Sequence, residues 1–455
     1  MSEPPEIPPL DDATRALLDR VRSRRTEPPA APADARVRVR AGVHASIGLA
    51  RKGTNDAPLG AGLGRARFLP FFFAAAASLL LAIGFGVSAR RGALPKQDER
   101  VAISASPCGG GASVDDDPHN CGRCGHDCCG GTCERGTCQP YVVAQGYHPG
   151  VAAVGGAYVY WPDGSDSLGR IMRAPKRGDG EPSVVASNQR RPWAVAVDDS
   201  FAYWVTNIGE APDYGGVFKA PLGGGDVIPL VASGEPFAGD IAVTSTGLYW
   251  DDYGAYPSQG RNLLDCAPGA AIRRSNLDGS GVATLAGPDG GVCTPLLFAV
   301  HEDEVFWASR SRGSVDRVQI DGGGFAHVAA ASDPMSVAVG ESDVFWVSWQ
   351  DGLVGRSPLA GGASVIVASS GHEAGANGGV GGVDVVVDDS YVYWARQGPP
   401  WGSGGAILIA PISQSTGEEG AVLATSPGPV NLTLDQACLY WADGSDGKIR
   451  GVAKP

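Results

Sequence analysis

The stretch VDDSYVYW at residues 387–394 repeats, almost letter for letter, the stretch VDDSFAYW at residues 197–204. Both are copies of one pattern, in which an aliphatic residue stands six positions before a Tyr or Phe and seven before a Trp. Five further copies occur, and the spacing is the same in all of them. The tryptophans of the seven copies are Trp161, Trp204, Trp250, Trp307, Trp346, Trp394 and Trp441. Seven of the ten tryptophans therefore have an architectural role.

The spacing of the copies predicts the fold. Successive tryptophans are 43, 46, 57, 39, 48 and 47 residues apart, which is typical of β-propeller blades. Each repeat divides into four short strand-like segments separated by turn residues. Neighbouring residues of a strand face opposite sides of a sheet, so the aromatic pair suits a blade covered on both faces. The prediction is an all-β, seven-bladed β-propeller over residues 140–455.

The two ends of this domain are predicted to meet. Only six fourth strands follow a tryptophan motif, and the chain stops at Pro455 just after a third strand. The segment PYVVAQG around Tyr141 has the fourth-strand pattern but precedes the first motif. We expect this N-terminal outer strand to complete the last blade, which would close the ring and remove an exposed edge.

The chain before the propeller is predicted to carry a membrane anchor. Residues 68–89 are uncharged and apolar, and as a helix they are long enough to cross a bilayer. Residues 1–67 form a predicted disordered cytoplasmic tail, helical in spacing only at 10–25, and residues 90–107 a linker. All ten cysteines follow the apolar segment, which indicates that only the C-terminal part reaches an oxidising compartment. The interpretation is a single-pass protein of the cell membrane with a cytoplasmic N-terminus and a periplasmic or extracellular propeller.

A cleaved signal peptide is the alternative for this segment. Val87, Ser88 and Ala89 form a passable cleavage site for small residues. Secretory leaders normally run to about 15 to 30 residues, so a leader preceded by a 67-residue tail would be unusually long. The anchor is therefore preferred.

Residues 108–139 form a cysteine-rich module. Cys-x-x-Cys spacing beside His119 and His126 could suggest zinc, but an oxidising location favours disulfides. The run resembles the small NCGxCGxxC-type modules found near the start of many bacterial extracytoplasmic proteins, which implies a stapled, non-catalytic spacer of unknown pairing. The positions that match this pattern are Cys108, Cys121, Cys124, Cys128, Cys133 and Cys138.

The resemblance leaves Cys129 as a surplus cysteine in the module. Outside it, Cys266 and Cys293 fall in loops that the topology places on one face, so they are predicted to pair. Cys129 and Cys438 then remain, and they either join the module to the propeller or stay free.

The segment AIRRSNLDGSGVATLAG at residues 271–287 and the seven aromatic–Trp pairs resemble the YWTD propellers of the low-density lipoprotein receptor family and their bacterial relatives. The resemblance covers about residues 141–455. The Asp that ends the family's motif is matched at Asp163, Asp252 and Asp443 only. Thr206, Ser309, Ser348 and Arg396 replace it elsewhere, and family members have six blades where this chain has seven motifs.

One face of the predicted propeller carries the long loops. Loops from the second to the third strand, and from the fourth strand to the next blade, emerge on the same side. Exposed aromatic and guanidinium side chains are favoured in binding patches. The candidates on this face are His148, Arg190, Arg191, Trp193, Tyr214, Tyr253, Tyr256, Trp349 and Trp401. In the alternative interpretation the loops fold over their own aromatic residues.

The sequence favours binding over catalysis. It contains no nucleophile elbow, zinc-protease or phosphate-loop motif, and of the propeller histidines only His148 and His372 are expected on the ligand face. The prediction is a non-enzymatic binding module for a protein, peptide or glycan, with no nucleic-acid partner and no required cofactor. A lactonase-like hydrolase, a cyclic-peptide lyase and a structural envelope scaffold are the alternatives. Asp251 and Asp252 are a weak candidate pair for Ca²⁺.

Overall fold

The computed structural model describes residue 108 and residues 113–164, 168–207, 215–235, 238–254, 269–288, 292–293, 295–371, 381–398 and 404–455. The predicted tail, membrane segment and linker lie outside these residues. Within the described part, no helix is both long and apolar enough to cross a bilayer.

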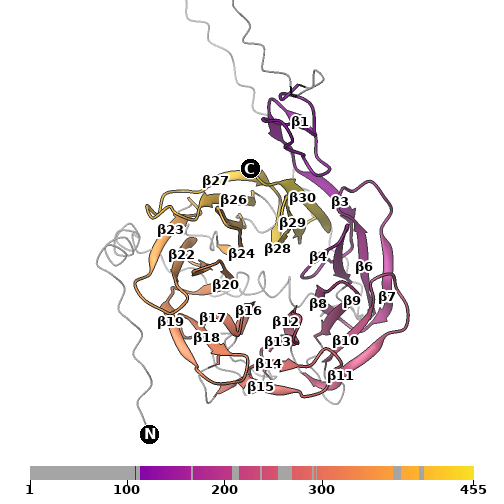
Figure 1. Cartoon of the computed structure of the whole chain (residues 1–455), viewed down its shortest axis with the longest axis vertical. Helices are drawn as coiled ribbons and strands as arrows, with labels where there is room; N and C mark the ends of the chain where they lie inside the picture. Colours follow the sequence, from indigo (N-terminus) through magenta and orange to yellow (C-terminus); the bar gives the residue numbers. More distant parts are fainter. Residues whose placement is uncertain are drawn as a thin grey trace, which may run out of the picture. The chain divides into compact units, whose positions relative to one another are not determined.

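Seven four-stranded antiparallel sheets surround a central axis as the blades of a propeller (Figure 1). Blade 1 contains β4 (Ala153–Gly155), β5 (Tyr158–Asp163), β6 (Gly169–Pro175) and β7 (Ser183–Gln189). Blade 2 contains β8 (Pro192–Val197), β9 (Phe201–Thr206), β10 (Gly215–Pro221) and β11 (Ile228–Glu235). Blade 3 contains β12 (Ala238–Val243), β13 (Leu248–Asp252), β14 (Ala271–Ser275) and β15 (Ala283–Ala286). Blade 4 contains β16 (Pro295–His301), β17 (Glu304–Ser309), β18 (Ser314–Gln319) and β19 (Ala326–Ala330).

The last three blades complete the ring. Blade 5 contains β20 (Pro334–Val339), β21 (Asp343–Ser348), β22 (Leu353–Pro358) and β23 (Val365–Ser369). Blade 6 contains β24 (Gly382–Val387), β25 (Tyr391–Arg396), β26 (Ala406–Pro411) and β27 (Ala421–Thr425). Blade 7 contains β28 (Pro429–Leu434), β29 (Cys438–Asp443), β30 (Lys448–Ala453) and, from the other end of the domain, β3 (Tyr141–Gln145). The predicted seven-bladed fold is confirmed.

Blade 7 is closed as the sequence predicts. Its order is β28-β29-β30-β3, and β3 runs antiparallel to β30 with Tyr141 opposite Gly451 and Gln145 opposite Lys448. Beyond the strand, the Gly146 amide donates to the carbonyl of Gly447 over 2.8 Å. We call the junction of blade 7 with blade 1, including β3, the seam.

The aromatic pair joins each blade to both of its neighbours. Trp250 lies in a buried cluster with Tyr203 of blade 2, whereas Tyr249 lies in a cluster with Trp307 of blade 4. The same arrangement, the Tyr or Phe of one blade with the Trp of the next, recurs in all seven clusters. An indole of this size buries enough apolar surface to contribute several kcal/mol.

The repeated letters DDS have a local explanation. In the turn between β8 and β9, one oxygen of Asp198 accepts the amides of Ser200 and Phe201 over 2.7 Å each. Its other oxygen accepts the hydroxyl of Tyr203 over 2.8 Å. Asp388 makes the equivalent bonds to Ser390, Tyr391 and Tyr393 in blade 6. The first Asp therefore shapes the turn and also satisfies the tyrosine that precedes the buried Trp.

The cysteine-rich module is built around the hairpin of β1 (Cys133–Glu134) and β2 (Thr137–Cys138). Its disulfides are Cys108–Cys124, Cys121–Cys133 and Cys128–Cys138. A fourth disulfide, Cys129–Cys438, joins it to the start of β29, which confirms the first of the two alternatives for these residues. Cys293 is disulfide-bonded, and its predicted partner Cys266 lies outside the described residues. The module also shares a buried core with blades 7 and 1.

The Asp388 turn gives a pH-dependent prediction. Burial would raise the pKa of Asp388, but hydrogen bonds from Ser390, Lys454 and Tyr391 outweigh this and lower it below 3.8. A carboxylate of this kind stabilises the fold above its unfolded pKa, and the effect is lost as the pH falls through the folded pKa. We expect Asp388→Ala to lower the free energy of unfolding by about 1 kcal/mol at neutral pH, allowing for partial exposure.

Urea unfolding of the full chain at several pH values measures this effect. The difference between wild type and Asp388→Ala should shrink as the pH is lowered below 3.8. A difference that stays constant down to about pH 2 would show that the carboxylate charge has no part in holding the turn.

Candidate ligand-binding face

The buried carboxylate of Asp163 organises the loop face at the seam. Asp163 ends β5 and is only 3% exposed. Its Oδ1 accepts the backbone amides of Tyr147 and His148 over 2.6 and 3.2 Å, and its Oδ2 accepts a guanidinium N–H of Arg170 over 2.9 Å. A single buried side chain thus fixes the segment that follows β3 and ties it to blade 1.

This arrangement leaves an aromatic and an aliphatic side chain in solvent. Tyr147 is 67% exposed, and its ring meets that of His148 edge to face with centroids 4.5 Å apart. Leu168 is 64% exposed and immediately precedes Gly169. We call Tyr147, His148, Leu168 and Arg170 the Tyr147 patch.

The patch borders the first strand of blade 2. Gly169 lies so close to Pro192 that an added Cβ would be 2.7 Å from the proline ring. The amide of Val151 donates to the carbonyl of Trp193 over 3.0 Å. Arg191, at the turn into β8, adopts a φ of 43°. The patch therefore rests on strands and tight turns of two blades.

The predicted face residues differ in how far they are exposed to solvent. His148 and Arg190 are exposed, and Arg191 and Trp193 are partly buried. Tyr214, Tyr256 and Trp401 lie outside the described residues, as does His372. Tyr253 and Trp349 are buried, at 7% and 5% exposure, so the expectation that they offer exposed contact area is wrong.

Glycines in or next to innermost strands explain the burial of these two rings. A Cβ added to Gly239 would come within 2.3 Å of the Tyr253 ring, and one added to Gly381 within 2.4 Å of the Trp349 ring. Both aromatic side chains therefore pack closely against a glycine backbone, which agrees with the alternative in which the aromatic residues of the loops are covered. Tyr147 and Leu168 are absent from the sequence-based candidates; the adjacency of Tyr147 to His148 was the available signal.

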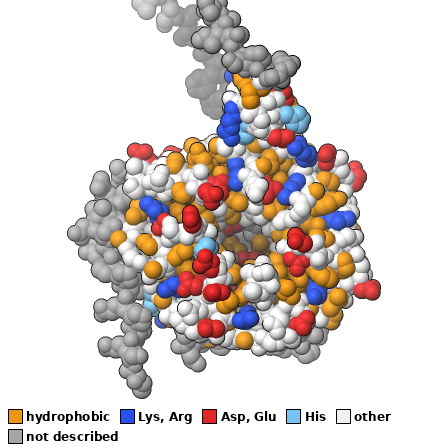
Figure 2. Space-filling view, in the orientation of Figure 1, with side chains coloured by type: hydrophobic (Ala, Val, Ile, Leu, Met, Phe, Trp, Pro, Cys, Tyr) orange, Lys and Arg blue, Asp and Glu red, His pale blue; other side chains and the backbone are white. Residues whose placement is uncertain are grey.

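The innermost strands bring two more carboxylates to the central channel. Asp384 accepts the hydroxyl of Ser336 over 2.6 Å and the amide of Leu432 over 2.6 Å, so it links blades 5, 6 and 7. Burial raises the pKa of Asp384 to about 6. Burial, with the charge of Asp384 adding to it, raises the pKa of Asp240 to about 7. Figure 2 shows one face of the ring with acidic side chains around its central hollow.

The candidate Ca²⁺ residues lie beside this channel. One oxygen of Asp251 accepts the amides of Gly239 and Asp240 over 2.9 and 2.6 Å, and burial holds the pKa of Asp251 well above its usual range. Asp252 lies 3.9 Å from the guanidinium of Arg273. In the described part of the chain, the one group of three Cys, His or acidic residues with converging ligand atoms is Cys121, Cys128 and Cys138, and each of these forms a disulfide.

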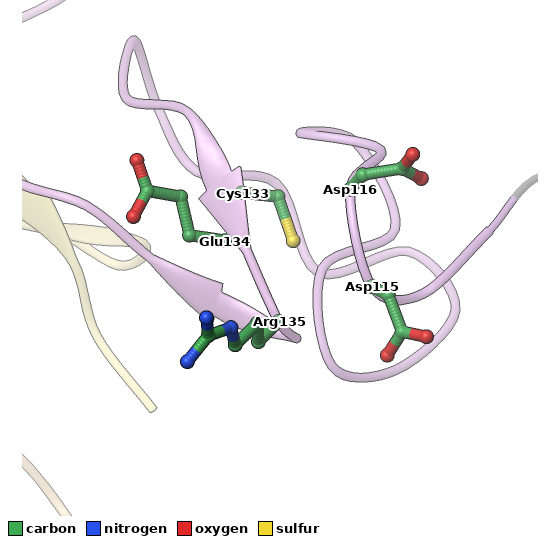
Figure 3. A pocket seen from close by; sticks show the side chains of 5 residues that line it. All are labelled: Asp115, Asp116, Cys133, Glu134 and Arg135. Carbon is green, nitrogen blue, oxygen red and sulfur yellow. The ribbon is translucent and has the colours of Figure 1, made fainter.

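Two other features do not form a reaction centre. His327, on the outer strand β19, lies 2.5 Å from Asp316 through Nδ1, with its side chain 12% exposed. A depression of about 500 Å³ on the module is lined by Asp115, Asp116, Cys133, Glu134 and Arg135. Figure 3 shows that Asp115 and Asp116 point away from Glu134 and Arg135.

Comparison with known proteins supports the fold. No protein-family model and no curated protein matches the chain. Streptogramin B lyase is similar with a TM-score of 0.50 at 10% identity, over 69% of this chain and 97% of the other. The WD40 propeller domain of Doa1 gives 0.50 at 12% identity, over 70% and 97%. A chain of the nidogen–laminin complex gives 0.37 at 20% identity, over 47% and 77%. At such identities the first two likenesses show the β-propeller fold alone.

The role of Asp163 can be tested by hydrogen exchange. Replacing Asp163 with alanine removes the acceptor of the Tyr147 and His148 amides, and Arg170 remains solvated because its side chain is 49% exposed. We expect both amides to exchange at least about tenfold faster, the equivalent of about 1.4 kcal/mol. Asp179→Ala, at an exposed position of the same blade, is the control. Equal exchange in the two variants would contradict the role of Asp163.

Proposed function

We propose that the propeller is an extracytoplasmic binding module that takes a protein, peptide or glycan ligand on its loop-rich face, centred on the Tyr147 patch. The observation that carries this proposal is the high exposure of Tyr147 and Leu168, each of which lies within two residues of a group bonded to the buried carboxylate of Asp163. They are the two most exposed large hydrophobic residues of the described part, at 67% and 64%. Large hydrophobic side chains held exposed in this way are typical of interaction sites.

The other exposed hydrophobic residues provide the contrast. They lie on or beside the outer strands of five different blades, one on each, and are Val142, Val184, Ile228, Val282 and Val422. Single apolar residues scattered over a surface are ordinary in soluble domains. The Tyr147 patch differs because Tyr147, His148 and Arg170 are all bonded to one buried carboxylate, and because it includes a guanidinium group.

The proposal includes the placement of the chain. Residues 68–89 anchor it in the membrane, with residues 1–67 in the cytoplasm and the propeller outside it. The four disulfides of the module and its link to blade 7 support an oxidising location. We further propose that the propeller is of YWTD type, because Asp163 and Asp443 both use a buried carboxylate to hold the loop beside the motif.

A second candidate function is a hydrolase or lyase acting in the channel. The observation that favours it is the pair Asp240 and Asp384, with pKa values raised to about 7 and about 6. Carboxyl groups that titrate near neutral pH are suited to general acid–base catalysis. We rank it second because Asp384 is bound to three strands in a way that serves the ring itself.

The binding face is tested with the full-length protein in detergent, screened against immobilised peptide and glycan panels. For any ligand found, Tyr147→Ala and Leu168→Ala should each weaken binding about tenfold or more, as expected for anchor residues. Ile228→Ala and Val422→Ala, at exposed positions on outer strands of blades 2 and 6, are the matched controls and should bind as wild type.

The same preparation separates the alternatives. Equal losses in the patch and control variants would exclude the Tyr147 patch as the binding site. Turnover of lactones or cyclic peptides by the wild type, abolished in Asp240→Asn, would instead establish the channel as an active site. If neither a ligand nor turnover is found, the result favours the interpretation of the propeller as a structural envelope scaffold.

The predicted membrane topology has its own test. In spheroplasts expressing the chain with a tag at each end, added protease should remove the C-terminal tag and leave the N-terminal tag intact. Both tags should sediment with the membrane fraction after alkaline carbonate washing. Loss of the N-terminal tag from a mature, soluble product would show that the segment is a cleaved leader.

A further inference from the structure

Blade 7 is the weak point of the ring because it is assembled from the two ends of the domain. The strands of every other blade are consecutive in sequence. Closure depends on β3, a strand of five residues, pairing with β30 across about three hundred residues of chain. Strand pairs that are distant in sequence carry the largest entropic cost of closure.

The cysteine-rich module lies directly on this weak point and contacts blade 7 from one side. Only Gln139 and Pro140 separate its last cysteine from β3. Cys129 is bonded to Cys438 at the start of β29, and His126 Nε2 hydrogen-bonds the carbonyl of Lys454 over 2.8 Å. The module is thus fixed to the two strands of blade 7 that precede β3 in the sheet.

The module also contacts blade 1 across the seam. The carboxylate of Asp127 accepts two N–H groups of Arg177, over 3.2 and 2.9 Å. Gly130 packs so closely that an added Cβ would come within 2.3 Å of the Arg177 carbonyl and 2.6 Å of the Tyr141 ring. Both sides of the seam are therefore joined through one small, disulfide-bonded unit.

The direction of β3 determines what a pull on the N-terminal side would do. Tyr141, at the start of β3, lies opposite Gly451 near the end of the chain. A force applied upstream of β3 would therefore open the β3–β30 pairs one after another from that end. The Cys129–Cys438 bond precedes β3 in the chain, so the force passes from Cys129 into β29 and bypasses β3.

We propose that the module is a covalent clasp, which holds the ring shut and carries tension from the N-terminal side into blade 7 without loading the strand that closes the ring. The first part of this proposal, that the module holds the ring shut, rests only on the contacts of the module. Its use under tension rests on the proposed membrane anchor, because an anchored domain that binds a ligand is pulled through its N-terminal side.

Single-molecule pulling on the two ends of the full-length chain in detergent tests the clasp. With the disulfide intact, the segment between Cys129 and Cys438, which are 309 positions apart in sequence, is shielded from force and releases no length. In the double variant C129S/C438S, force should peel β3 first and then unfold the ring. The added contour length should be about 1,000 Å, from about 3.3 to 3.6 Å per residue.

The control is the double variant C108S/C124S, which removes a disulfide internal to the module and keeps Cys129–Cys438. It should shield the ring from force as the wild type does. If wild-type protein with its disulfides formed released the full contour length of the ring, the proposal would be overturned. This measurement uses the wild type alone, so it does not depend on whether a variant folds.

Hydrogen exchange provides the second measurement. In C129S/C438S, the amides of β3 and β30 should exchange at least about tenfold faster, whereas those of β16–β19 on the far side of the ring should keep their rates. Unchanged protection of β3 would show that closure does not depend on the clasp. Neither experiment uses a ligand or a membrane, so its failure would leave the proposed binding function standing.

Discussion

The structure depends on one contact that is repeated at every blade junction, the packing of a Trp against the Tyr or Phe of the preceding blade. Seven buried clusters hold these pairs, and each cluster is shared by two blades. A blade on its own would leave both aromatic faces exposed, so the blades stabilise one another only as a closed ring. This explains the strict spacing of the motif, because a shift of one residue would turn the Trp and the Tyr to the wrong faces.

The position two residues after each Trp is free of this constraint, and it is where the blades differ. In blade 1 it is Asp163, which holds the Tyr147 segment, and in blade 7 it is Asp443, which accepts the amides of its own following loop. In blade 6 it is Arg396, which donates to the carbonyl of Ser370 over 2.7 Å. The ring thus keeps its packing positions constant and uses the end of the second strand to shape the loop face, which is where propellers with the same fold acquire different functions.

Sequence reasoning predicted a residue's environment correctly where the repeat determines that environment. It failed where segments far apart in the sequence determine it. The register of the Trp motif predicted the blades and the closing strand, and counting the cysteines led to the Cys129–Cys438 alternative. Nothing near Trp349 in the sequence indicates that Gly381 offers it a bare backbone to pack on. Likewise, the bonds of Asp384 to Ser336 and Leu432 span three blades and arise only when the ring closes. Local patterns cannot encode such contacts, because they depend on segments about fifty residues apart.

The seam brings the clasp and the candidate binding patch to the two ends of one short strand. The module precedes Tyr141, where β3 begins, and Tyr147 follows Gln145, where it ends. Peeling β3 from β30 would also withdraw the Tyr147 segment from Asp163, since the Gly146 amide is bonded to Gly447 across the same pairing. A ligand that binds only the ordered patch must therefore stabilise the closed ring, and a clasp strengthens binding by the factor by which it raises the population of the closed ring. Closure of the fold and formation of the binding face are in this sense a single equilibrium.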